Sequence, residues 1–282
     1  MNGIRRTFTD GFFWFVCAVA LGCIVAPATW IIVGLIGNAG PALRPTLLTA
    51  TTAHGGLQNA IIGTLLLAAG VLVIAGTTGI GAGIWLSEFA SGRLSSLLRF
   101  FPEVLAGVPS IVIGYTGYLL LVIQFHWGYS ILAAMLALSA IVTPYIVKTT
   151  EVALRQVPST LREGGVALGL PMVVSLRRIL LPPALPSIIT GLVVAIAIST
   201  GETAPLLYTA GFSDQNPTPQ LTQHPIGYLT YVAYTDIQLP SAQAHQLANA
   251  AAAVTLLFLL LLTLIGRLLS RHSSRMTARM GI

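Results

Sequence analysis

Six long apolar runs constrain the fold of this chain more than any other feature of its sequence. A helix needs roughly 20 mostly apolar residues to cross a bilayer core that is about 30 Å thick. The runs are continuous and do not alternate with period two, which excludes the strands of a membrane barrel. We therefore expect an all-α polytopic membrane protein in which residues 1–282 form one domain with six transmembrane helices. The expected spans are 12–36, 59–86, 101–123, 128–147, 186–208 and 244–269.

The amino-acid composition agrees with a membrane protein. Of the 282 residues, 55% are hydrophobic and only 8% are charged, whereas ordinary globular domains carry about 25% charged residues. So few charges cannot cover the surface of a water-soluble protein of this size. Arg5 and Arg6 precede the first run as in a signal peptide, but the run is too long for the apolar core of one. We expect it to remain as a span.

The positions of the basic residues predict the orientation of the chain in the membrane. With the N-terminus inside, all but one of the 14 Lys and Arg residues fall on the cytoplasmic side, and only Arg44 falls outside. Because cytoplasmic loops are enriched in Lys and Arg, both termini are expected in the cytoplasm. The net charge of +6 then follows from topology and from attraction to membrane lipid, and no nucleic-acid partner is expected.

Residue counts exclude several kinds of site. Cys17 and Cys23 are the only cysteines and lie in one apolar run, so neither a disulfide framework nor a cysteine zinc site is expected. Lys148 is the only lysine and has no glycine-rich run before it, which excludes a P-loop for ATP. The histidines lack the spacing of metal ligands on one helix. We therefore expect no catalytic residues, no metal site and no cofactor bound by this chain.

The cytoplasmic connection at residues 148–185 is too long for a simple turn between spans. Thr160, or Ser159 after Pro158, is expected to cap a short helix that runs through Glu163 to Leu168, and Gly169 is expected to end it. Pro171 then begins a second short helix outside the bilayer. Three prolines mark the expected start of the fifth span: Pro182, Pro183 and Pro186.

The order of residues in this connection resembles the cytoplasmic signature of the permeases of binding-protein-dependent ABC importers. Glu163-Gly164-Gly165 stands where the family has Glu-Ala-Ala, Gly169 follows at the family spacing, and Ile179 to Pro182 matches Ile-x-Leu-Pro. The resemblance implies a coupling helix that seats in a groove of a separate ATPase subunit, which binds ATP and Mg²⁺. Arginines around the helix offer charge-assisted contacts to that partner. The residues expected to couple to the ATPase are Arg162, Glu163, Gly164, Gly165, Ala167, Leu168, Gly169, Ile179 and Pro182.

The extracytoplasmic connection at residues 205–243 is also long, and it contains five prolines and no Lys or Arg. Its stretch 225–231 has the aromatic content of a segment at the membrane interface. Two interpretations remain open: a loop that rests on the headgroups, or a docking platform for an external solute-binding protein.

Polar residues at membrane depth require an explanation, because a charge in hydrocarbon costs a few kcal/mol or more. Glu88 and Glu103 lie near cytoplasmic span ends, where a structural role is expected, and Arg99 is placed to pair with Glu103 one turn away. Glu202 lies well inside the fifth span, and Pro205 is expected to break the helix just past it. We expect this segment to line a substrate pathway, through Ser199, Thr200, Gly201, Glu202 and Thr203.

Three segments are similar to the A-type membrane permease of the bacterial phosphate-specific ABC importer: 79–90, 107–114 and 201–207. The resemblance implies an importer of type I permease fold in the bacterial plasma membrane, carrying inorganic phosphate, and it adds Ser110 to the pathway. It also implies a sister permease that completes a heterodimer, an ATPase homodimer and an extracytoplasmic phosphate-binding protein.

One departure concerns Ile198, which stands where many relatives have an arginine one turn before Gly-Glu-Thr. Glu202 is then expected either to pair with an arginine of the sister subunit or to accept a hydrogen bond from protonated phosphate. The alternatives are the same fold carrying molybdate, sulfate, phosphonate or an organic solute, and an intramembrane enzyme. The enzyme is disfavoured because no histidine lies near the centre of a span to serve as a base.

Overall fold

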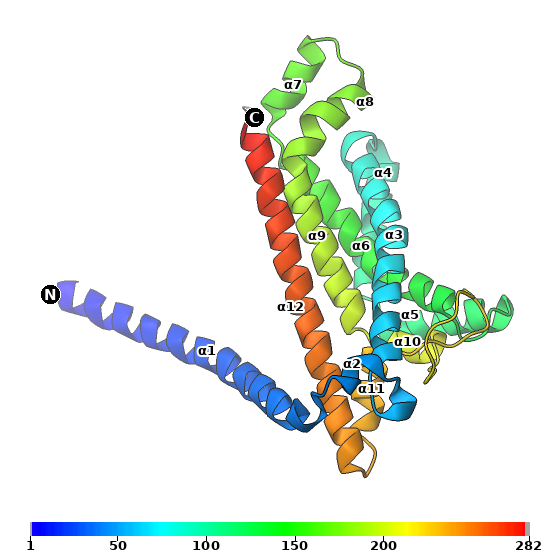
Figure 1. Ribbon diagram of the computed structural model, residues 1–282. Helices are drawn as coiled ribbons and strands as arrows, with labels where there is room; N and C mark the ends of the chain where they lie inside the picture. Colours follow the sequence, from blue (N-terminus) through cyan, green and yellow to red (C-terminus); the bar gives the residue numbers. More distant parts are fainter. Residues whose placement is uncertain (1, 280–282) are drawn as a thin grey trace.

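The computed structural model describes residues 2–279, and side chains are described outside 1–10, 41, 94 and 272–282. The described residues form helices and connecting segments without a strand, as expected for an all-α protein. Figure 1 shows their arrangement. The elements are α1 (Asn2–Ala39), η1 (Gly40–Ala42), α2 (Thr46–Thr49), η2 (Thr52–His54), α3 (Gln58–Glu88), α4 (Gly92–Ala106), α5 (Ser110–Gly117), η3 (Tyr118–Gln124), α6 (Ile131–Arg155), α7 (Ser159–Ala167), α8 (Met172–Ser175), η4 (Leu176–Leu180), α9 (Leu181–Gly201), α10 (Ala204–Thr209), α11 (Leu229–Asp236) and α12 (Ala242–Arg279).

The described part of the chain has 5 helices long and apolar enough to cross a membrane, and up to 6 spans if one bent pair counts as a span. The bent pair is Ser95–Ala106 with Ser110–Gln124, which meet at 98°. The run expected as a span over 101–123 is therefore not one continuous helix but lies across this bend. Pro109 has no backbone N–H and disfavours helical geometry at Val108, so the helix stops at Ala106 and restarts at Ser110 in a new direction.

The limits of the fourth and fifth spans also differ from those expected. The helix α6 continues to Arg155, two turns beyond residue 147. The fifth helical segment is continuous over Met172–Gly201, so the three prolines lie inside it rather than at its start. A π-helical turn, η4, precedes α9, and the wider turn makes room for the rings at the start of α9. The second short helix expected in the connection, α8, is thus an extension of the fifth helical segment.

The bundle is built on the contact between α3 and α6, with α9 packed beside them and α12 against α9 (Figure 1). Gly79 and Gly83 let α3 approach α6 closely, because a Cβ at either position would overlap Ile146 or Thr150 of α6. The central core is apolar and includes Leu67, Leu138 and Ala195 from these three helices.

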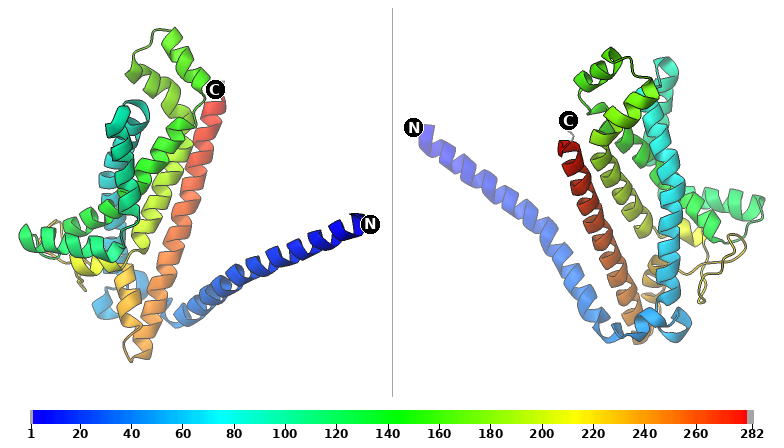
Figure 2. Two further views of the ribbon diagram at one scale, coloured as in Figure 1. Left: turned by 180° about the vertical axis from the view of Figure 1, so that it is seen from behind. Right: turned by 45° about the horizontal axis from the view of Figure 1, so that its top comes forward.

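The first helix diverges from the bundle. Residues 11–34 are all exposed, and α1 contacts the bundle near its C-terminal end, where Ala39 is buried, mainly through α12 (Figure 2). Its apolar surface is therefore left for lipid or for another subunit.

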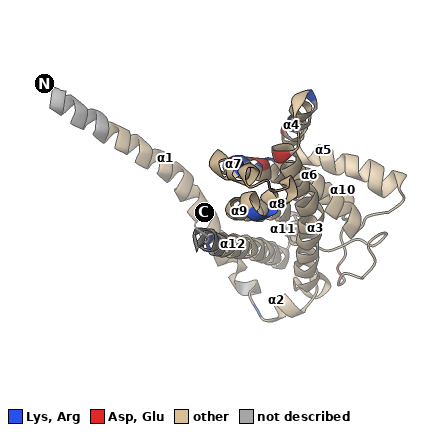
Figure 3. Cartoon of the chain, turned by 90° about the horizontal axis from the view of Figure 1, so that it is seen from above, with Lys and Arg blue, Asp and Glu red and all other residues tan. Residues whose placement is uncertain are grey.

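Charged side chains gather at one end of the bundle, around α4, α7 and α8 (Figure 3). Such a gathering is expected of the side that faces the aqueous cytoplasm. Four arginines used to predict the orientation lie outside the residues whose side chains are described: Arg5, Arg6, Arg275 and Arg279.

Candidate translocation site and coupling surface

The helix break lies at Glu202 and Thr203. Glu202 has extended backbone angles (φ −71, ψ 136), and α10 begins at Ala204 with Pro205 in its first turn. The break thus lies between the end of α9 and Pro205, which is tolerated in the first turn of α10 because a helix start needs no N–H there. The Thr230 hydroxyl donates to the freed Glu202 carbonyl at 3.0 Å. A broken helix at membrane depth needs this kind of support from neighbouring protein.

Two of the segments that resemble phosphate permeases pack directly against each other. The helix α5, which carries Gly114, contacts α10, which carries Pro205. A Cβ added at Gly114 would lie 2.9 Å from Pro205 Cβ and closer still to Pro205 Cα. The structure therefore brings the segment 107–114 beside the helix break, although the two lie about 90 residues apart in the sequence. Ser110 is half-buried at the start of α5.

The hydroxyl residues expected along the pathway fall into two groups. Ser199 and Thr200 are buried, and both donate to the Ile196 carbonyl of their own helix, at 2.9 and 2.8 Å. Their hydroxyl protons are therefore engaged in hydrogen bonds within α9. Glu202 and Thr203 are only half-buried, and the Glu202 carboxylate has no hydrogen-bond or ion-pair partner among the described residues. Gly201 is exposed beside them.

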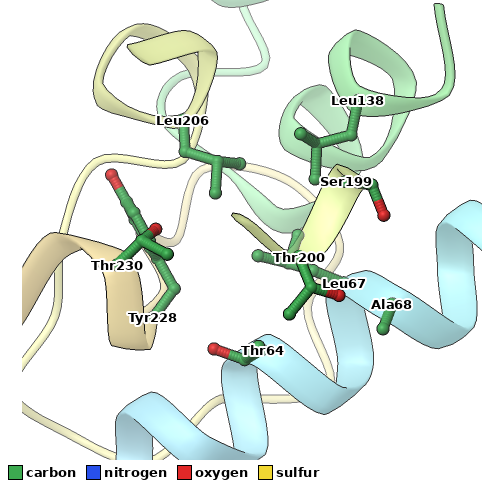
Figure 4. Close-up of a pocket in the computed structure, with 9 residues that line it drawn as sticks. All are labelled: Thr64, Leu67, Ala68, Leu138, Ser199, Thr200, Leu206, Tyr228 and Thr230. Atoms are coloured by element: carbon green, nitrogen blue, oxygen red, sulfur yellow. The ribbon is translucent and has the colours of Figure 1, made fainter. Parts of the chain in front are cut away.

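A small cavity of about 10 Å³ lies at this junction, room for about one water molecule. Figure 4 shows side chains of α3, α6, α9 and α10 around it, together with Tyr228 and Thr230 from the connection at residues 205–243 (the outer connection). The Tyr228 hydroxyl is buried and has no hydrogen-bond partner in the described part of the chain. Burial raises the pKa of Tyr228, and Tyr231 acts in the same direction. The lining residues are Thr64, Leu67, Ala68, Leu138, Ser199, Thr200, Leu206, Tyr228 and Thr230.

Four tyrosine rings form a cluster near the break that the sequence reasoning missed. Tyr208 of α10 contacts Tyr115 and Tyr118, with ring centres 5.8 and 6.4 Å apart, and Tyr118 stacks on Tyr129 at 6.1 Å. The cluster is partly exposed. Tyr115 and Tyr118 are three residues apart on one helical face, which is the signal that a search of the sequence for aromatic spacing could have used.

The outer connection is packed against the bundle and is not a free loop. Asn59 of α3 is fully buried and donates to the Ser213 carbonyl at 2.8 Å, while its side-chain oxygen accepts from the Thr52 N–H at 2.9 Å. The Thr52 hydroxyl donates to Asp214 at 2.7 Å. These bonds hold residues near 213 on the start of α3. Sequence reasoning assigned Asn59 only to the edge of a span.

Asp236 ends α11 in the same connection. Partial burial raises the pKa of its carboxyl group, a hydrogen bond with the Thr235 hydroxyl opposes this, and the negative charge of Asp214 adds to it. Among the described residues, no three His, Cys, Asp or Glu side chains form a group that could hold a metal ion.

The short helix α7 ends at Gly169, as predicted. Gly169 has φ +65, its N–H donates to Val166 at 2.9 Å, and the Leu170 N–H donates to Gly165 at 3.1 Å. This pair of bonds is a Schellman ending, which requires a left-handed residue. At the other end, Pro158 holds the N-cap position and no side chain caps the helix, so the predicted Ser159 or Thr160 cap is wrong.

One side of α7 faces away from the bundle. Val166 is 79% exposed and Leu168 is 75% exposed, and nothing lies within 4 Å of a Cβ added at Gly164. Apolar side chains so exposed outside the spans are typical of a protein contact. Val166 was not among the residues predicted from the sequence. The predicted coupling residues on this outward side are Glu163, Gly164, Ala167, Leu168 and Gly169.

The other predicted coupling residues face inward. A Cβ at Gly165 would lie 2.7 Å from Ser175 Oγ and 3.3 Å from Ile179 Cδ1, so Gly165 and Ile179 pack α7 onto the fifth helical segment. Pro182 is half-buried in that segment. Arg162 also turns inward, where it pairs with Glu88 of α3.

The predicted pairing of Arg99 with Glu103 is wrong. Arg99 of α4 pairs instead with Glu151 of α6 at 2.6 Å, and Glu103 pairs with Lys148 of α6 at 2.8 Å. Because α4 lies along α6, Arg99 and Glu103 each reach an opposite charge on that neighbour. The Glu151 side chain is only 6% exposed, and it forms a second ion pair with Arg155 at 3.0 Å.

Residues 79–278 match the family described as the binding-protein-dependent transport system inner membrane component. The chain belongs to this family. It is therefore a multi-pass membrane protein of the ABC transporter permease class. The family match includes the short helix α7 and the helix break, but not the diverging helix α1.

Curated relatives cover nearly the whole chain. A protein of Mycobacterium bovis named "Phosphate transport system permease protein PstA 2" is 48% identical over 96% of this chain and 91% of the relative. A Xylella fastidiosa "Phosphate transport system permease protein PstA" is 36% identical over 83% of each. A Bacillus subtilis relative named "Probable ABC transporter permease protein YqgI" is 31% identical over 94% of this chain and 96% of its own.

Solved structures agree with the fold. A chain of the inward-facing MetNI methionine ABC transporter aligns with TM-score 0.61 and 18% identity, covering 77% of this chain and 97% of the other. A chain of an amino acid ABC transporter aligns with TM-score 0.55 and 20% identity, covering 77% and 92%. The expected permease fold of ABC importers is confirmed.

Proposed function

We propose that this chain is a permease subunit of an ATP-driven importer that carries inorganic phosphate across the bacterial plasma membrane. The observation that carries the proposal is the 48% identity, over 96% of the chain, to a permease named for phosphate transport. The packed segments at Gly114 and Pro205 support it, because they place the resembling residues at one helix break. Both termini are assigned to the cytoplasm, on the side where α7 lies.

The chain supplies a path and a mechanical connection rather than chemistry. An ATPase homodimer binds ATP and Mg²⁺ and closes against the outward side of α7, where Val166 and Leu168 are exposed. A sister permease completes the path, and α1 has the uncovered apolar surface to contact it. The two permeases then tilt as rigid bodies to open the path to alternate sides of the membrane. The outer connection is the docking platform for an extracytoplasmic phosphate-binding protein.

Glu202 is the specificity group in this proposal. Its carboxylate lies at the break, half-buried and without a partner among the described residues. A carboxylate only accepts hydrogen bonds, so it accepts one from phosphate, which keeps a proton at neutral pH, and repels sulfate, which does not. Thr203, Gly201 and the half-buried Ser110 complete the path, and Ser199 and Thr200 support the end of α9 behind them. An arginine of the sister subunit provides the positive charge that this chain lacks there.

A second cargo is favoured by one observation. Ile198 is 41% exposed at the position where an arginine was expected, so the site offers an anion less positive charge than phosphate transport favours. The same fold would then carry an organic solute that needs no positive charge, whereas molybdate, sulfate and phosphonate are anions and need that charge as phosphate does.

Uptake of labelled phosphate at low micromolar concentration tests the cargo. Cells that lack this gene and other phosphate importers are given back the intact gene or a Gly169→Arg version. We expect the intact gene alone to restore uptake, with arsenate but not sulfate competing. If the intact gene restores no phosphate uptake, the cargo assignment is wrong while the family assignment stands.

A further inference from the structure

Glu88 and Arg162 join the exposed helix α7 to two membrane-spanning helices. Glu88 is the last residue of α3, and its carboxylate accepts a hydrogen bond from Arg162 Nη1 of α7 and another from Ser87 Oγ at 2.7 Å. The second guanidinium nitrogen of Arg162 donates to the Leu154 carbonyl of α6 at 2.8 Å. One planar side chain thus connects α7 with the ends of α3 and α6.

The carboxylate of this ion pair is withdrawn from water. The Glu88 side chain is 1% exposed, and Arg162 is 32% exposed. A buried charge is strongly destabilised when its partner is removed, so the two groups hold each other in place. The pair between Lys148 and Glu103 is different, because its side chains are 50% and 60% exposed. An ion pair so exposed to solvent contributes little, and it serves as a matched control.

The helix α7 has few other attachments to the bundle. Gly165 packs on Ser175 and Ile179, and Leu161 packs against the buried apolar cluster that includes Leu154 and Leu180. Within the described residues, no other α7 side chain forms a hydrogen bond or ion pair. Because α8 follows α7 in the chain, α7 is tied to the fifth helical segment by the backbone. Its polar link to α3 runs through Arg162.

The helix α3 carries this link from the cytoplasmic end to the translocation site. It has 31 residues and is therefore about 45 Å long. Near its other end, Thr64, Leu67 and Ala68 line the small cavity at the helix break, as Figure 4 shows. A helix packed over its length moves as a rigid body, so a displacement at Glu88 reaches this cavity.

We propose that the Arg162–Glu88 ion pair transmits the movement of α7 to α3 and thereby couples ATP hydrolysis to movement of the cargo. Both are positioning residues that touch neither ATP nor solute. The inference rests on the proposed contact between α7 and an ATPase. It differs from a docking role, because Arg162 points into the bundle and leaves the outward side of α7 unchanged.

The test uses the whole importer reconstituted in vesicles with its binding protein. Glu88→Gln keeps the volume of the side chain, and Arg162→Gln removes the charge of the partner. The double variant completes a double-mutant cycle. Lys148→Gln is the control, because it removes an ion pair that is exposed to solvent. Three quantities are measured: co-purification with the ATPase, ATP hydrolysis stimulated by the binding protein, and phosphate uptake per ATP hydrolysed.

We expect both single variants to co-purify and to hydrolyse ATP within about twofold of the wild type, while uptake per ATP falls at least tenfold. The double variant should be no worse than the worse single one, because two partners of one link are not additive. Lys148→Gln should leave uptake per ATP unchanged.

An unchanged uptake per ATP in both single variants, or effects that multiply in the double variant, refutes transmission through this pair. Loss of co-purification in both variants also refutes it, by showing a docking role. If the wild-type chain does not co-purify with the ATPase, the proposed function itself is wrong, which distinguishes the two failures.

Discussion

The contact between Gly114 and Pro205 allows a quantitative test of the packing at the helix break. Gly114→Ala places a Cβ 2.9 Å from Pro205 Cβ and closer to Pro205 Cα, so α5 and α10 must separate by about 1 Å to reach an ordinary contact of 3.4–4 Å. Neither atom can rotate away, because both belong to the backbone or to a ring. Overpacking of this kind costs about 1–3 kcal/mol, against about 1 kcal/mol gained from the helix propensity of Ala.

Gly81→Ala measures the gain in helix propensity without the overpacking. Gly81 lies within α3, and nothing lies within 4 Å of a Cβ added there. The midpoint of thermal unfolding in detergent should therefore be lower for Gly114→Ala than for Gly81→Ala, by about 2–12 °C. Phosphate uptake should fall at least about tenfold in Gly114→Ala alone, because α10 carries the residues that follow Glu202. Equal midpoints for the two variants, with full uptake, would show that α5 and α10 are not in contact.

Three further changes have defined outcomes. Asn59→Ala leaves the half-buried Ser213 carbonyl without its donor, which should cost about 1–3 kcal/mol and expose the outer connection to limited proteolysis. Leu168→Asp should weaken co-purification with the ATPase at least tenfold without lowering the unfolding midpoint, because the side chain is 75% exposed. Asp236→Asn should raise the unfolding midpoint at pH 7, because the raised pKa of Asp236 means that its charged form is disfavoured in the folded state. This penalty is absent below the ordinary pKa of 3.8 and grows as the pH rises through the folded-state pKa, so the two proteins should converge near pH 3.

Each of these predictions has a control. Asn216→Ala changes an exposed amide of the same connection and should leave proteolysis unchanged. Val174→Asp changes a half-buried residue of α8 and should lower the unfolding midpoint, unlike Leu168→Asp. In a protein that also carries Asp214→Asn, Asp236→Asn should raise the unfolding midpoint by less, because the charge of Asp214 contributes to the raised pKa of Asp236. A difference between wild type and Asp236→Asn that is constant over pH 3–7 would contradict the titration argument.

The all-α class, the long apolar helices and the ending of α7 at Gly169 could all be predicted from the sequence. These features depend on local chemistry: the length of apolar runs, and a glycine at the one position that needs positive φ. Span limits were less predictable. The bend at Pro109 and the continuation of the fifth helix through its prolines depend on whether neighbouring helices accept a break or a wider turn.

The contacts between distant residues required the structure. Arg99 has Glu103 one turn away, and local spacing favoured that pair, yet the packing of α4 on α6 places Glu151 at 2.6 Å. In the same way, Glu88 and Arg162 are 74 residues apart, and no spacing rule connects them.

Local sequence features are thus enough to recognise a chain that crosses the membrane and a short helix that ends at Gly169. Which residues of that helix point into the bundle and which point away depends on how the helices pack. Arg162 and Leu168 belong to one short segment, but one is joined to Glu88 and the other is open to a partner. The physical reason is that apolar length and turn chemistry act locally along the chain, whereas burial and ion pairing depend on which helix faces lie together.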